Sequence, residues 1–350
     1  MAFPKVFDGH NDFLNLDLSR PVADSVAAFR DGAPGHIDLA KAAKGGLGGG
    51  FFAVYVPSPM DLDGLTDQME NPPYAIDNPP PVPFDQAIPV VLKQIALLSA
   101  LEREGLVRIC TEAAQIADCL ANGPMAAILH FEGSEAIDPD FQALEVYYRA
   151  GLRSLGPVWS RDTRFAHGVP FRFPSTPDIG PGLTDEGKAL VMACNQMGIM
   201  IDLSHMNEAG FWDVVRLSDA PLVATHSNAH AICPHARNLT DQQLKAIADS
   251  DGMVGLNFAT AFLREDGIME PEAPMEILIR HLDHLIEHVG EDRVGIGSDF
   301  DGAIVPADIA DCAGLPVLQQ AMADHQYGEE LIEKISHGNW MRVLKKTWGA

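Results

Sequence analysis

Histidine and aspartate stand two residues apart near the start of the chain, as His10 and Asp12. They close the apolar segment KVFDGHND, whose composition is typical of a buried β-strand. Side chains two residues apart point to the same face of a strand, so this pair could hold one metal ion. An H-x-D pair has little weight alone, because polar residues end many strands. Its meaning depends on further ligands elsewhere in the chain.

Four more polar residues occur at the ends of apolar segments further along. They are Glu132 in MAAILHFEG, His205 in IMIDLSH, His226 in PLVATHSN and Asp299 in RVGIGSDFDG. Taken singly, a histidine at a strand end is commonly a polar cap, and an acid often begins the next helix. Because all four stand at the ends of predicted strands, where the catalytic residues of a barrel gather, one shared site is favoured instead.

The chemistry of these side chains suits a divalent metal. Imidazole and carboxylate ligands without thiolates are typical of Zn²⁺ with an open coordination position. His10, Asp12, Glu132, His205 and His226 supply enough ligands for two ions. Two Zn²⁺ ions bridged by Glu132 and a hydroxide would supply a nucleophile at neutral pH and a Lewis acid for the attacked carbonyl. The residues therefore predict a metal-dependent hydrolase.

Eight short apolar segments must position these residues. They span residues 5–12, 49–57, 125–133, 152–160, 199–205, 221–228, 253–260 and 293–302. Helix patterns lie between them, most clearly at 185–197, from Thr240 onward with a capping box to Gln243, and at 274–289. This alternation predicts an α/β fold, a (β/α)8 TIM barrel of the metal-dependent hydrolase (amidohydrolase-like) type, as a single domain over residues 1–350.

Two stretches depart from the alternation. Residues 57–87 are too rich in proline and aspartate for a strand or a long helix, and residues 160–183 are similarly rich in proline, glycine and arginine. Both follow predicted strands, which places them at the carboxyl end of the barrel. We therefore expect two active-site loop insertions there.

The amino-acid composition limits the kinds of molecule that the protein is expected to bind. The net charge of −25, with no run of Lys or Arg, argues against nucleic acid, and an anionic substrate group would need a dedicated local cation. No window approaches the roughly 18 uninterrupted apolar residues of a membrane span, so we expect a cytoplasmic protein without a membrane partner. Five cysteines without a C-x-x-C pair indicate reduced thiols. The sequence leaves the oligomeric state open, with a homodimer as one option.

The other histidines are expected to have structural or solvent-facing roles. His281, His284 and His288 flank the apolar face of the last helix pattern, which favours a solvated or half-buried position. His130 lies within the strand that ends in the predicted glutamate, and a structural role is favoured there.

The motifs together resemble those of the membrane (renal) dipeptidase family, peptidase family M19. DGHND, GGFFAVYVP, FEG, GLRSL, DLSH, THSNAH, RNLTD and GSDFDG occur in family order over essentially the whole chain. The resemblance implies a bacterial cytoplasmic-type member with two Zn²⁺ ions and a small dipeptide substrate. It places His10 and Asp12 on the first ion, His205 and His226 on the second, and Glu132 between them.

The resemblance also implies which residues contact the substrate. Arg237, eleven residues after His226, matches the arginine that binds the terminal carboxylate, a task that suits a bidentate guanidinium. Asp299 matches the aspartate that contacts the substrate amine and serves in proton transfer. The expected activity is zinc-dependent hydrolysis of free dipeptides, including those with a C-terminal D-residue.

Two positions depart from the family pattern. Glu135 in EGSE stands where a histidine is common, and Trp159 in PVWS stands where the family has a histidine that assists the carbonyl oxygen. We expect Trp159 to contact the substrate. Arg161 and His167 are the neighbouring groups that could replace the missing histidine.

Three alternatives remain open at this point. A mononuclear zinc deaminase of nucleobases or nucleosides would use Glu208, three residues after His205, as its general acid and base. A lysine-bridged amidohydrolase is disfavoured, because no lysine occurs between residues 147 and 175. A barrel that lost catalysis is suggested by Trp159, but the complete ligand set argues against it.

Overall fold

Eight parallel strands form the centre of the molecule in the computed structural model, which describes residues 3–16, 18–32, 34–58 and 62–349. Each lies within one of the eight segments expected from the sequence, apart from the first residues of the second strand. These strands are β1 (Val6–Asn11), β2 (Leu47–Tyr55), β5 (Met125–Glu132), β6 (Leu152–Gly156), β8 (Met200–Ile201), β9 (Val223–Ala224), β10 (Met253–Leu256) and β11 (Val294–Ile296). Their residues are almost all buried, as expected when helices cover a parallel sheet.

The strands close into a barrel. One sheet has the order β1-β2-β5-β6-β8 and another the order β11-β10-β9. Single parallel bridges between Asp202 and Val223, and between Asn11 and Phe300, join the two sheets at both edges. The closed order confirms the predicted (β/α)8 barrel, and it brings the carboxyl ends of all eight strands to one rim.

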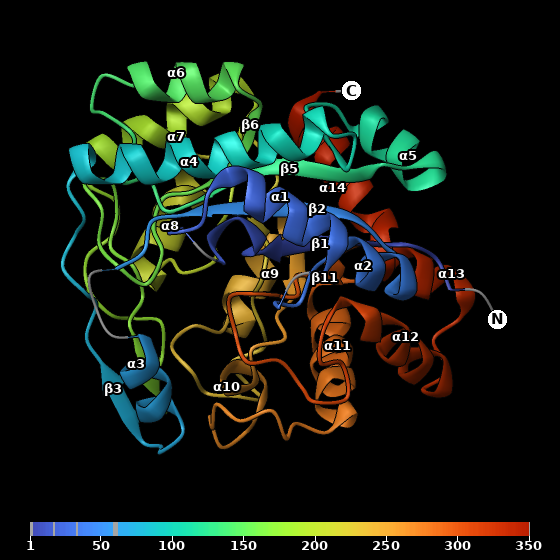
Figure 1. Cartoon of the computed structure of the whole chain (residues 1–350). Coiled ribbons are helices and arrows are strands. Elements are labelled where there is room, and N and C mark those ends of the chain that lie inside the picture. Colours follow the sequence, from blue (N-terminus) through green and yellow to red (C-terminus); the bar gives the residue numbers. More distant parts are fainter. Residues whose placement is uncertain (1–2, 17, 33, 59–61, 350) are drawn as a thin grey trace.

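Helices surround the barrel (Figure 1). They are α1 (Val22–Asp31), α2 (Leu39–Gly45), α3 (Leu62–Met69), α4 (Phe84–Arg103), α5 (Ala113–Asn122), α6 (Gln142–Arg149), α7 (Asp185–Met197), α8 (Glu208–Leu217), α9 (Asp241–Asp249), α10 (Thr260–Leu263), α11 (Met275–Val289), α12 (Leu315–Asp324), α13 (Glu329–Glu333) and α14 (Asn339–Trp348). The three helices predicted most clearly are confirmed as α7, α9 and α11. Gly198 ends α7 in the left-handed conformation, and Thr240 and Gln243 form the expected capping box of α9.

The C-terminal helix α14 closes the amino-terminal end of the barrel. The fully buried Trp340 donates from Nε1 to the carbonyl oxygen of Ile296 at 3.0 Å. Its ring lies 5.2 Å from that of Phe51, which belongs to the same buried cluster as Phe7. Because side chains fill this end, a ligand must enter at the opposite rim.

The two expected insertions pair with each other. β3 (Tyr74–Ile76) comes from residues 57–87 and β7 (Phe171–Phe173) from residues 160–183, and they form an antiparallel ladder. The expectation of no strand in these stretches is therefore wrong, because pairing between them supplies hydrogen bonds that composition does not reveal. Figure 1 shows β3 and α3 at the lower left, on the side of the molecule opposite α13. Residues 59–61 of the first insertion lie outside the described part of the chain.

Helix α4 and the five cysteines relate to two expectations, the lack of a membrane span and the presence of reduced thiols. α4 is the one helix among the described residues with the length and hydropathy of a membrane span, and 39% of its most apolar window is buried. Leu97, Leu98 and Leu101 of α4 pack into the main hydrophobic core, a role that apolar helices of this length commonly have. All five cysteines are buried and free. The short strand β4 (Val107–Ile109) also pairs with β5, in parallel, beside β2 and β6.

Candidate metal centre

A pocket of about 330 Å³ opens at the carboxyl ends of the strands. Its polar floor is formed by Asp12, Glu132, His205 and Asp299. Its apolar wall is formed by Met69, Trp159, Phe171, Phe262, Met269 and Ile304, which come from the segments that follow the strands. The volume is within the range of sites for small molecules.

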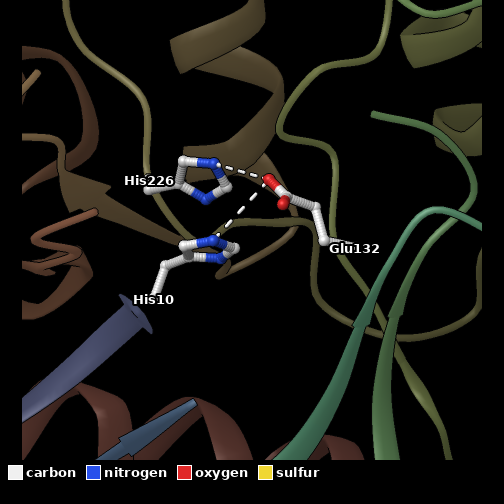
Figure 2. Close-up of side chains that lie close together, drawn as sticks. All are labelled: His10, Glu132 and His226. Atoms are coloured by element: carbon white, nitrogen blue, oxygen red, sulfur yellow. Dashed lines mark ion pairs between the residues drawn. The ribbon is translucent and has the colours of Figure 1, made fainter. Parts of the chain in front are cut away.

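Glu132 lies at the centre of the floor. Its Oε1 is 3.0 Å from His205 Nε2, 3.5 Å from His226 Nε2 and 3.6 Å from His10 Nε2. Figure 2 shows the rings of His10 and His226 beside this carboxylate. A carboxylate gathered with three imidazoles is the kind of donor set that a divalent metal ion prefers.

His10 also faces two aspartates. Its Nε2 is 3.2 Å from Asp12 Oδ2, and ligand atoms of His10, Asp12 and Asp299 all lie within 4.8 Å of one another. The Nε2 atoms of His205 and His226 are 3.2 Å apart, and the ring centres of His10 and His226 are 3.8 Å apart. The five predicted ligands are thus brought together around Glu132.

The backbone is strained at two of these residues. His205 has φ of 66° and Asp299 has φ of 61°, in the left-handed region that residues other than glycine rarely occupy. Such conformations persist where surrounding contacts impose them, and they occur often at functional sites. Asn257 holds Asp299 through a 2.9 Å hydrogen bond from Nδ2 to Oδ2.

Hydrogen bonds to the second ring nitrogen orient His205 and His226. His205 Nδ1 is 2.9 Å from Ser160 Oγ, and His226 Nδ1 is 2.8 Å from Thr225 Oγ1. Thr225 in turn donates to the buried carboxylate of Asp202 at 2.6 Å. In metal sites, partners of this kind fix the ring and leave the other nitrogen free for the ion.

Burial sets the protonation of the cluster. It lowers the pKa of His205 and of His226 well below the ordinary value, so both rings are neutral and can offer a lone pair. Burial raises the pKa of Glu132 well above its usual range. Burial also lowers the pKa of His10, but the carboxylates of Glu132 and Asp12 outweigh it and raise the value to about 10. Buried carboxylates that draw a proton in this way need a positive charge, which a divalent ion supplies. The donor set therefore fits a metal.

Arg237 is buried close enough to Asp299 and Glu132 to interact with their charges, although it is not among the described residues that line the pocket. It is 4% exposed and donates to Ser227 Oγ at 3.0 Å and to the carbonyl oxygen of His226 at 3.1 Å, while its Nε has no partner. Its Cζ lies 5.7 Å from the centre of the Phe262 ring in the pocket wall. His235 Nδ1 accepts from the Arg237 backbone N–H at 2.9 Å and so helps to place this loop.

Trp159 lines the pocket, but the two groups expected to compensate for it do not. Its ring lies 5.2 Å from Tyr55 and 5.8 Å from His205. Arg161 is fully buried and binds Oε1 of Glu135, the other residue that departs from the family pattern, at 2.6 Å. His167 binds Asp162 at 3.0 Å. Neither Arg161 nor His167 is among the described residues that line the pocket.

Four residues of the site were missed in the sequence. Tyr55 is the last residue of β2 and Asn257 directly follows β10, so the rule that selected the histidines would have found them too. Phe171 gave no such signal, because its place in the wall depends on the pairing of β7 with β3. Asp301 also lines the pocket, and burial raises its pKa to about 7.

The histidines outside the floor differ from one another. The expectation for His281 is wrong, since it is fully buried, bonded to Leu263 O at 2.9 Å and to Ala229 N at 3.2 Å. His284 and His288 are half-buried, as expected, next to Asp241. His130 is buried beneath the floor, with Nδ1 2.8 Å from Ser154 Oγ.

Glu208, the acid required by a deaminase, faces away from the pocket. Its Oε1 accepts a hydrogen bond from Trp212 Nε1 at 3.1 Å, one turn along α8. It is not among the described residues that line the pocket. The position matches an acid at a helix start and gives the deaminase alternative no support.

The family comparison covers nearly the whole chain. The model of the membrane dipeptidase family, peptidase family M19, matches residues 1–348. The matched span contains every predicted ligand and all three residues expected to contact the substrate.

Individual relatives agree with the family match. A crystal structure of a metallopeptidase from Rhodobacter sphaeroides, liganded with a phosphinate mimic of the dipeptide L-Ala-D-Ala, is 54% identical, with a TM-score of 0.97 and coverage of 99% of this chain and 100% of that one. A Klebsiella pneumoniae protein from the pqqA 5′ region is 46% identical over 76% of this chain and 99% of its own. The dipeptidase tcpJ of Claviceps purpurea is 26% identical over 97% of this chain and 76% of its own.

Proposed function

The chain belongs to the membrane dipeptidase family, peptidase family M19, and on this premise we propose that it is a zinc-dependent dipeptidase whose metal centre contains two ions. Membership makes it a metallo-dipeptidase. The identity and number of the ions, the residues that bind them and the stereochemistry of the substrate are the parts that we propose.

One observation carries the proposal of two ions. Glu132 Oε1 lies between His205, His226 and His10 at 3.0 to 3.6 Å, with Asp12 beside His10. This arrangement supports His10 and Asp12 as ligands of one Zn²⁺, His205 and His226 as ligands of the other, and Glu132 as the bridge. Two such ions, when bound, supply a bridging hydroxide as the nucleophile and polarise the peptide carbonyl.

The chain's own charged groups then select a free dipeptide. Arg237, with an unpartnered Nε and a buried guanidinium, is suited to bind the terminal carboxylate. Asp299, held by Asn257, is suited to bind the free amine and to pass a proton to the departing amino group. Both residues thereby make activity depend on free termini.

The apolar wall of the pocket influences which substrates can bind. Trp159, Phe171 and Phe262 give it an aromatic surface that suits apolar side chains. The Rhodobacter sphaeroides relative binds a mimic of L-Ala-D-Ala. We therefore include dipeptides with a C-terminal D-residue among the proposed substrates.

The proposal extends to the organisation of the protein. We place one catalytic barrel domain over residues 1–350, with the insertions 57–87 and 160–183 shaping the pocket entrance. We propose a cytoplasmic location without a membrane partner. A homodimer remains the assembly to test first.

A dipeptide screen with metal analysis tests this function. Sets of L,L-, L,D- and D,D-dipeptides are assayed on protein whose zinc is quantified by mass spectrometry, with N-acetylated and C-amidated versions as matched controls. We expect about two zinc ions per chain, turnover of free dipeptides, and loss of activity with a chelator. Equal turnover of blocked and free dipeptides would contradict the proposed recognition of both termini. One zinc per fully active chain would contradict the two-ion site.

A further inference from the structure

Tyr55 stands beside the central carboxylate of the floor. It is the last residue of β2, and the register of the β2–β5 ladder pairs it with Glu132, the last residue of β5. Paired residues in neighbouring parallel strands project to the same face of the sheet. The phenol and the Glu132 carboxylate therefore enter the pocket side by side, and both line it.

The Tyr55 hydroxyl is buried and makes no hydrogen bond of normal length and angle. The residue is 5% exposed, and the nearby side chain of Ser58, which accepts a hydrogen bond from Arg161, is the one polar group among the described residues that interacts with the hydroxyl at longer range. Tyr74, another buried tyrosine, donates to the carbonyl oxygen of Gly267 at 2.9 Å. An unpaired buried hydroxyl costs stability, and such groups are rare unless a ligand completes them.

The surrounding contacts hold Tyr55 firmly. The buried Gln94 of α4 accepts from the Tyr55 backbone N–H at 2.8 Å and donates to its carbonyl oxygen at 2.6 Å. On the side chain, the Trp159 ring lies 5.2 Å away and the Arg161 guanidinium 5.6 Å away. The hydroxyl is thus fixed in advance, as an efficient hydrogen-bond donor in a catalytic site must be.

The other polar groups of the floor define what Tyr55 can contribute. Asp12, Glu132 and Asp299 are carboxylates, which accept hydrogen bonds when ionised and repel a developing negative charge. A phenol keeps its proton at neutral pH and can donate it in a hydrogen bond. Tyr55 therefore complements the carboxylates at an oxygen that becomes negative during the reaction.

We propose that the Tyr55 hydroxyl donates a hydrogen bond to the oxygen of the attacked peptide carbonyl as that oxygen gains negative charge. This rests on the proposed dipeptidase function and adds a catalytic residue to it. The proton stays on Tyr55 throughout, so no bond to Tyr55 forms or breaks. The hydrogen bond is stronger to the tetrahedral state than to the substrate, and it acts on kcat rather than on KM.

The test compares Tyr55→Phe with Tyr147→Phe. Tyr147 is a buried tyrosine of α6 that packs on Phe131 outside the barrel, with 4.9 Å between ring centres. We expect Tyr55→Phe to lower kcat about 10²-fold with KM changed less than about 3-fold. The affinity for a phosphinate dipeptide mimic, whose tetrahedral oxygens resemble the reaction intermediate, should fall by a similar factor in calorimetry. Zinc content should match that of the wild type and the melting temperature should not fall, whereas Tyr147→Phe should change neither the kinetics, the phosphinate affinity nor the zinc content.

The possible results separate this proposal from the proposed function. An active wild type with an unchanged Tyr55→Phe variant, or a variant changed only in KM, would overturn the role of Tyr55 alone. Loss of zinc from Tyr55→Phe would also overturn it, since Tyr55 would then support the metal. If the wild type hydrolyses no dipeptide, the role of Tyr55 is still decided by comparing the phosphinate affinity of the wild type with that of Tyr55→Phe. A wild type that neither hydrolyses dipeptides nor binds the phosphinate would overturn both proposals.

Discussion

The polar floor and the apolar wall of the same pocket are built in different ways. The floor residues lie at the ends of barrel strands, where hydrogen bonds to Ser160, Thr225 and Asn257 hold them. The wall includes Trp159 and Phe171, which lie on the segment that connects β6 to α7. We infer that the floor determines the reaction and the wall determines which side chains are accepted, because rigid strand ends fix ligand geometry whereas connecting segments vary without disturbing the barrel.

The largest expected effect is that of Glu132→Gln in the floor. The amide is a poor bridge between two ions, so zinc should fall below two per chain and kcat should drop at least about 10³-fold for every dipeptide. Metal analysis and kinetics on the same sample measure both. Glu208→Gln is the matched control, since Glu208 bonds Trp212 on α8. A fully active Glu132→Gln variant with two zinc ions would refute the assignment of the bridge.

Arg237→Ala removes the cation next to the floor. We expect kcat/KM for free dipeptides to fall about 10²-fold or more, because a carboxylate is left in a buried site without its partner. Zinc content should stay constant. For C-amidated dipeptides, which lack the carboxylate, wild type and variant should differ little. An equal loss for free and amidated substrates would show that Arg237 acts on the structure of the loop and not on the substrate.

A change in the wall should affect selection more than rate. Trp159→Ala is expected to raise KM for dipeptides with large apolar side chains about 10-fold, because aromatic contact area is lost. The kcat should change less than about 3-fold. Trp212→Ala, at a half-buried tryptophan on α8, is the control. A drop in kcat as large as that of a floor variant would end the proposed division between floor and wall.

The smallest effect is expected outside the pocket. His284 Nε2 lies 2.8 Å from Asp241 Oδ1 on the outer face, and with His288 these residues could also bind a metal. We expect His284→Ala to change the free energy of unfolding by about 1 kcal/mol or less and to leave activity and zinc content unaltered. Denaturant titration and metal analysis check this. Loss of one zinc from this variant would mean that part of the bound metal lies outside the pocket.

Much of the barrel and the floor is predictable from sequence. Continuous apolar segments identify all eight strands, and the polar residues at the ends of five of them identify side chains that meet in one place, because parallel strands in a closed barrel bring their carboxyl ends to one rim. The helix boundary at Gly198 and the capping box at Thr240 were also predictable, since both signals are local.

The remaining features depend on contacts between distant segments. Only the antiparallel pairing of β3 with β7 places Phe171 in the wall, and only the register of β2 against β5 places Tyr55 beside Glu132. His281 follows the periodicity of an exposed helix face, yet loops that carry Ala229 and Leu263 bury it. The amino-acid sequence determined by itself which side chains the floor contains, because that information lies within single strands. The tertiary structure alone decided which groups surround them, because burial and partners arise only when separate segments pack together.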